Sequence, residues 1–202
     1  MIDVEAHFLQ ALRDLQTQFH KNELAYLALT SKPEFAIRDK LAFNLHQSLL
    51  ARGLIVSREW KRTDLAVLLE ARPQALLEIK AMFSFDAVKK GRPSHQYESL
   101  LQSDVAKARK VALSQTQIFA LLLSTHPAAS FDPRLRGVVK YLTKINSNYR
   151  GMSASEIREN ATSAVRSWPS SRLVRTAGTI AAGEAFGVEV KLDYWLFKFP
   201  AA

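Results

Sequence analysis

The spacing of apolar side chains changes along the chain, and each change marks a different kind of predicted element. Residues 3–29 carry apolar positions at helical spacing, which predicts an N-terminal helix. Residues 33–51 predict a second, amphipathic helix that Gly53 should end. The period then shortens to that of strands. We expect three short strands there, over residues 54–60, 63–70 and 75–83.

The next part of the chain predicts a helix and then a buried strand. Residues 94–115 return to helical spacing, and residues 117–125 form a solid apolar run, as expected for a strand covered on both faces. Further helices are expected around 133–146 and 154–167, and the tail should add one or two strands. Ser153 and Glu156 match the capping box that opens the last of these helices.

This order of elements predicts an α/β fold with a mixed sheet flanked by helices on both faces. The length of 202 residues fits a single domain. We expect that domain to span residues 1–202, with a core at about 33–125, an N-terminal helix and a C-terminal extension over 130–202.

Composition narrows the class of partner. The apolar fraction of 48% fits a folded globule, and the net charge of +9 favours a polyanion, nucleic acid first and an anionic membrane second. The chain has no cysteine, which excludes thiolate nucleophiles and cysteine zinc sites. The longest aliphatic stretch, 118–123, is too short for a bilayer, and the start does not resemble a signal peptide. We expect a soluble, cytoplasmic protein without a membrane partner.

Three charged residues interrupt the apolar runs of the predicted strands. Asp64 opens one strand, and Glu78 and Lys80 lie within the next, where they point to the same face. A hairpin symmetric about Pro73 would place Asp64 opposite Met82, about two pleats from Glu78 and one from Lys80. Twist or a bulge could close that gap. The three side chains are therefore expected to converge.

Two carboxylates with a lysine have a chemical use. Asp64, Glu78 and the carbonyl of Ile79 offer the oxygen ligands that Mg²⁺ prefers, and Mn²⁺ could substitute. Lys80 could orient or deprotonate a water and stabilise the developing negative charge on a phosphate.

The helix over 33–51 could add a third carboxylate. With Ile37 at zero, the apolar stripe extends to roughly 120°, and Glu34 falls inside it at roughly 60°, whereas Asp39 lies outside at roughly 200°. Glu34 is therefore the better candidate ligand. Arg38 also lies on the stripe, so an ion pair between Arg38 and Glu34 is the alternative.

The pattern of Asp64 followed by Glu78-Ile79-Lys80 resembles the PD-(D/E)xK nuclease superfamily, which has the restriction-endonuclease-like fold. The order αβββαβ over 33–125 is similar to the core of that family. The resemblance implies that Asp64 and Glu78 are metal ligands, Lys80 the catalytic lysine and Glu34 an accessory ligand, and that cleavage leaves 5′-phosphate ends. A threonine replaces the name-giving proline before Asp64, and the branch of the family stays unassigned.

Basic residues flank the predicted site in the sequence. They could hold phosphates beside the scissile bond, although a solvated basic loop is the alternative for each. The candidates are Arg58, Lys61, Arg62, Lys89, Lys90 and Arg92. Asp104 and Lys107 are expected to form a surface pair, and the three tryptophans to pack in the core.

The sequence thus predicts a Mg²⁺-dependent nuclease that hydrolyses phosphodiester bonds, most simply a DNA endonuclease of defence, mobile-element or repair type. The alternative is a non-catalytic nucleic-acid-binding or assembly subunit on the same fold. A homodimer or a partner subunit is compatible with either function.

Overall fold

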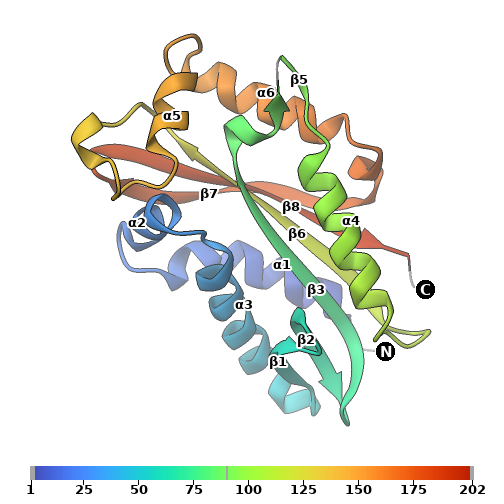
Figure 1. Cartoon of the computed structure of the whole chain (residues 1–202). Coiled ribbons are helices and arrows are strands. Elements are labelled where there is room, and N and C mark those ends of the chain that lie inside the picture. Colours follow the sequence, from blue (N-terminus) through green and yellow to red (C-terminus); the bar gives the residue numbers. More distant parts are fainter. Residues whose placement is uncertain (1–2, 90, 201–202) are drawn as a thin grey trace.

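A mixed six-stranded sheet forms the centre of the molecule, which we describe from a computed structural model covering residues 3–89 and 91–200 (Figure 1). The strand order is β1-β2-β3-β6-β8-β7, and β3 and β6 run parallel while the other neighbours are antiparallel. The strands are β1 (Ile55–Trp60), β2 (Thr63–Leu69), β3 (Arg72–Phe83), β6 (Gln117–Pro127), β7 (Val174–Ala185) and β8 (Val188–Phe199). The predicted α/β class and mixed sheet are confirmed.

Helices cover both faces of this sheet, as predicted. Their apolar stripes place α1, α2 and α3 against one face, and α4 and α6 against the other (Figure 1). The helices are α1 (Val4–Asp14), α2 (Glu23–Thr30), α3 (Glu34–Leu49), α4 (Gln96–Arg109), α5 (Leu142–Asn148) and α6 (Ala154–Arg166). Strands β4 (Val88–Lys89) and β5 (Arg92–Pro93) form a separate small hairpin. Across the described residues, no helix has the length and apolar character needed to cross a membrane.

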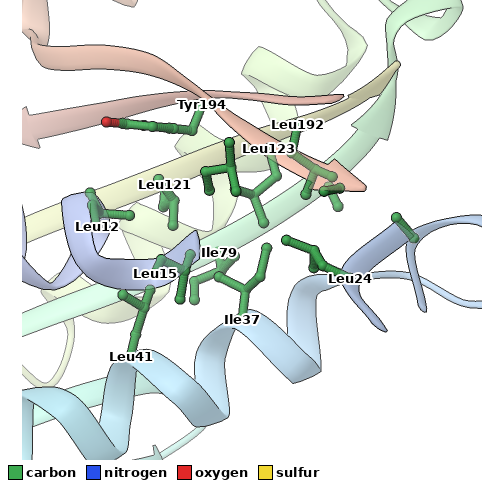
Figure 2. Close-up of a cluster of buried hydrophobic side chains, with 14 of the residues drawn as sticks. Leu12, Leu15, Leu24, Ile37, Leu41, Ile79, Leu121, Leu123, Leu192 and Tyr194 are labelled. Atoms are coloured by element: carbon green, nitrogen blue, oxygen red, sulfur yellow. The ribbon is translucent and has the colours of Figure 1, made fainter. Parts of the chain in front are cut away.

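The alternation of side chains along the strands builds two cores. Leu121 and Leu123 of β6 point toward α1–α3, and Leu122 between them points toward α4 and α6. Figure 2 shows the first core, where side chains of α1 and α3 meet Ile79 of β3 and Leu121 of β6. Burying one such leucine or isoleucine is worth about 2 kcal/mol, so the packing fixes which face each strand residue takes.

The hairpin between β2 and β3 turns earlier than the sequence predicts. Its two-residue turn is Glu70–Ala71, and both residues have positive φ (48° and 63°), the geometry of a type I′ turn. The symmetric register about Pro73 is therefore wrong. Pro73 lies inside β3, opposite Leu68, where a register shift interrupts the ladder. A proline that lacks an N–H fits such an irregular position.

Two predicted helices are also shorter or broken. The stretch 3–29 divides into α1, a 3₁₀ turn at Leu15–Gln18 and α2, because the chain reverses at Asn22, which has φ 67°. The predicted helix 133–146 is a 3₁₀ turn at Pro133–Leu135 followed by α5. By contrast, the capping box at Ser153 and Glu156 is present, and the tail forms the two strands β7 and β8.

Candidate active site

The candidate site lies where β3 extends past the end of β2 (Figure 1). The ladder between these strands runs from Leu69 and Arg72 to Leu65 and Leu77. On its other side, β3 stays paired with β6 up to Phe83. The second half of β3 therefore has a free edge toward α3.

Two carboxylates occupy this free edge of β3. Asp64 Oδ2 accepts a hydrogen bond from the backbone N–H of Ile79 at 2.7 Å, and Glu34 Oε1 accepts one from the N–H of Ala81 at 2.5 Å. The N–H and C=O of one strand residue point to the same side, so the Ile79 carbonyl also faces this edge. Carboxylates from β2 and α3 thus bracket a backbone carbonyl of β3.

Glu78 joins Asp64 because of the true hairpin register. Extending the ladder by one residue beyond Leu65 and Leu77 places Asp64 directly opposite Glu78, with both side chains on the α4 side of the sheet. Glu78 is only 5% exposed. Burial, followed by the negative charges of Asp64 and Asp104 and a hydrogen bond with Asp64, raises the pKa of Glu78 to about 8.

Lys80 is held by Asp104, which the sequence predicts to lie on the surface. Its Nζ lies 2.7 Å from Asp104 Oδ2, while Lys107 Nζ binds Asp104 Oδ1, also at 2.7 Å. Burial lowers the pKa of Lys80, but the hydrogen bond and charge of Asp104, with Glu34 and Asp64 nearby, outweigh burial and raise it. The pair of Asp104 and Lys107 exists, yet Asp104 is buried rather than on the surface.

A signal for Asp104 was present in the sequence. With Tyr97 at zero on a helical wheel, Asp104 falls at roughly −20°, inside the apolar stripe that covers the sheet. A carboxylate at that place needs a cation on the sheet below, and Lys80 supplies it.

The alternative partner for Glu34 is not found. Arg38 binds Asp39 at 3.0 Å and Glu59 at 2.7 Å, so the alternative pairing of Arg38 with Glu34 is wrong. Glu34 reaches the edge of β3 instead.

The donor set at the free edge is compatible with a hard divalent cation. In the part of the chain that the structure describes, no group of three or more His, Cys, Asp or Glu side chains is poised to hold a metal. Asp64, Glu78 and the Ile79 carbonyl nevertheless offer only oxygen, which suits Mg²⁺. Burial and the charges of Asp64 and Asp104 raise the pKa of Glu78 by more than the Lys80 ammonium lowers it, and a cation between the two carboxylates would favour ionised Glu78.

The basic candidates divide between two hairpins. Lys61 and Arg62 form the exposed tip between β1 and β2, immediately before Asp64, and the Lys61 ammonium lies 4.6 Å from the Trp60 ring centroid. Arg58 is engaged by Asp39 at 2.9 Å. The exposed side chains of Lys89 and Arg92 belong to the β4–β5 hairpin, and Lys90 lies outside the described residues. The tryptophan prediction holds for Trp168 and Trp195, which are buried.

A wider groove runs between α6 and strands β7 and β8, away from these carboxylates. Asp193 in this groove is buried and pairs with Arg158 at 2.5 Å. Comparisons with family models, curated proteins and solved structures found no match to this chain. The functional assignment therefore depends on the side chains at the edge of β3.

Proposed function

We propose that this protein is a metal-dependent nuclease that hydrolyses phosphodiester bonds, with DNA as the preferred substrate. One observation carries the proposal: Asp64 and Glu78 face each other beside the free edge of β3, and Glu78 keeps a pKa of about 8. An acid whose pKa is strongly perturbed by burial and by a specific charged neighbour is a candidate functional residue.

In this proposal Asp64, Glu78 and the Ile79 carbonyl hold Mg²⁺. Glu34 would join them by exchanging its bond to the Ala81 N–H for the ion. When bound, the ion would supply Lewis acidity and positive charge against the oxygens of a phosphodiester.

Lys80 serves as a fixed positive charge in this site. Asp104 holds its ammonium at 2.7 Å and raises its pKa, so Lys80 stays protonated and donates hydrogen bonds. Because this donor is already fixed in a partly buried site, it can stabilise negative charge that develops on a phosphate without first changing its own position. Lys61 and Arg62, at the hairpin tip beside Asp64, would hold flanking phosphates.

A cleavage assay tests the proposal. Supercoiled plasmid, linear duplex and single-stranded DNA, with an RNA of the same sequence, are incubated with Mg²⁺ or Mn²⁺ and with a chelator. We expect metal-dependent cutting that leaves 5′-phosphate ends. Lys80→Ala should lower the rate at least about 100-fold, because it removes the donor beside the phosphate.

Lys107→Ala is the matched control. Lys107 binds the other oxygen of Asp104 at the same distance, but its side chain is 66% exposed. It should leave the rate within about threefold of the parent, since exposed ion pairs contribute little. Equal losses in both variants would indicate a structural role for the cluster. Binding of DNA without cutting under any condition would favour the non-catalytic binding protein.

A further inference from the structure

A small hollow of about 10 Å³ lies near the end of β3. Among the residues that line it are Lys32, Ala81, Asp86, Tyr97, Thr125 and Tyr141. Ala81 is the residue whose N–H binds Glu34, so the hollow begins where the candidate metal site ends. Tyr97 lies close to Glu34, Asp86 and Tyr141, whose charges act on its hydroxyl.

Tyr141 presents an exposed aromatic ring at this hollow. Tyr141 is 47% exposed, and its ring packs nearly perpendicular to the Phe83 ring at 5.5 Å between centroids. Its backbone has φ 58° and ψ 22°, a left-handed conformation that non-glycine residues seldom adopt. A strained backbone that holds an aromatic ring half in solvent is a reason to look for a ligand.

The segment around Tyr141 is rigid and basic. The backbone N–H of Lys140 donates to the carbonyl of Leu29 at 2.7 Å, which fixes the loop against α2. The Lys140 ammonium lies 5.5 Å from the Tyr141 ring centroid, and Lys32 lies at the hollow itself. An anion would therefore meet a preorganised surface of one aromatic ring and two cations.

The hollow also has a hydrogen-bond donor, the phenol of Tyr97. Burial, followed by the charge of Asp86, raises the pKa of Tyr97 to about 12, so its phenol remains a donor. A sugar or phosphate oxygen fits this donor better than an apolar ligand does.

We propose that Tyr141, with Lys32 and Lys140, is a stacking platform for one unpaired or terminal nucleotide next to the phosphate held at Asp64 and Glu78. This inference rests on the proposed nuclease function and names its substrate class. Bases inside a duplex are already stacked on both sides, so a protein ring can stack only on a base that is unpaired or at an end. Single strands, flaps and ends are therefore the expected substrates, in preference to intact duplex.

Binding measurements separate this platform from catalysis. The parent protein for them is Glu78→Gln, which removes a proposed metal ligand, so that Mg²⁺ can be present during binding. The probe is a fluorescein-labelled twelve-residue oligothymidylate read by anisotropy, and covalently closed, relaxed duplex circles serve as competitor. Tyr141→Asn removes the ring but suits a left-handed backbone. Tyr141→Phe keeps the ring.

We expect Tyr141→Asn to weaken binding of the single strand about 5- to 150-fold, the equivalent of one base stack of about 1–3 kcal/mol. Binding of the closed circles should change less than about twofold, and Tyr141→Phe should behave as the parent. Tyr26→Asn is the matched control, because Tyr26 is 54% exposed on α2, beside Phe186. It should leave both affinities unchanged.

Three results would overturn the platform: unchanged single-strand binding in Tyr141→Asn, equal losses on single strands and circles, or a Tyr141→Phe variant as weak as Tyr141→Asn. If Tyr141→Asn does not fold, the parent is compared on normal and abasic strands, and equal affinity for the two rejects stacking. A wild-type protein that cuts nothing while Tyr141 controls single-strand binding would reject the nuclease and support the platform. Cutting that does not depend on Tyr141 would support the nuclease and reject the platform.

Discussion

Replacing Glu78 by glutamine should stabilise the metal-free protein, and by more as the pH rises. Glutamine keeps the size of the side chain but cannot ionise. The pKa of Glu78 is about 8 in the folded protein, against an ordinary value of 4.5. Between these values the unfolded chain has lost the proton that the folded protein keeps, so stability falls as the pH rises.

The magnitude follows from this difference in pKa. Each pH unit between the two pKa values costs about 1.4 kcal/mol of folding free energy. Ionisation of Glu78 should therefore destabilise the wild type by less than about 1 kcal/mol at pH 5, about 3 kcal/mol at pH 7 and about 4 kcal/mol at pH 8. Urea denaturation of both proteins in chelator, at these three values of pH, measures the gap directly.

Glu98→Gln should change stability in the opposite direction, although Glu98 is as deeply buried as Glu78. Glu98 is 4% exposed, but it accepts bonds from the N–H and hydroxyl of Ser170 and contacts His95. Burial would raise its pKa, yet these hydrogen bonds outweigh burial and lower it, so its contribution is present above pH 4.5 and is lost at lower pH. Its replacement should cost about 1–3 kcal/mol at pH 7.

Two outcomes would refute the reasoning about Glu78. One is a difference between wild type and Glu78→Gln that does not widen from pH 5 to pH 8. The other is a Glu78→Gln variant that is less stable than wild type at every pH. Added Mg²⁺ should restore stability to the wild type at pH 8 and do less for the variant, because the glutamine side chain is a weaker ligand.

Two further changes test the fold. Gly178→Ala should lower stability by about 1–3 kcal/mol in thermal denaturation, because a Cβ would lie 2.6 Å from the hydroxyl of buried Tyr194. Gly151→Ala should leave stability unchanged, because nothing lies within 4 Å of the added Cβ. Equal losses of stability in the two variants would contradict the close contact between Gly178 and Tyr194. Ala71→Gly should stabilise the protein by about 0.5–1 kcal/mol in urea, because φ is 63° there. A loss of stability would argue against the left-handed turn.

The elements of the sheet could be predicted because their apolar patterns extend over several residues. The main elements from α3 to β6 were predicted in order, although the helix expected at 94–115 ends at Arg109 and the small β4–β5 hairpin was not expected. The hairpin register could not be predicted, since Glu70 and Ala71 carry no glycine or asparagine to mark a left-handed turn and Pro73 is the stronger turn signal. Its correction places Asp64 directly opposite Glu78 rather than about two pleats away.

Other parts of the site depend on contacts between distant segments. The hydrogen bond from the Ala81 N–H to Glu34 joins residues 47 positions apart. The helical wheel could indicate only that the Glu34 side chain faces the sheet. Asp104 was misassigned because the pairing with Lys107, three residues away, is the local explanation for its charge. The sequence does not indicate a role for Tyr141, because the residue is exposed only where the helix predicted at 133–146 is broken.

The number of residues in the turn at Glu70–Ala71 is constrained as strongly as the identity of the residues in the hydrophobic core. Side chains on β2 alternate between the two faces of the sheet, so inserting or deleting one residue in the turn would move Asp64 from the α4 side to the α1–α3 side. Leu65 and Val67 would move to the α4 side at the same time, and Ala66 and Leu68 to the α1–α3 side. Sequences that preserve this protein's activity should therefore accept at these two exposed positions any residue that tolerates a left-handed backbone, and should hardly vary in the number of turn residues.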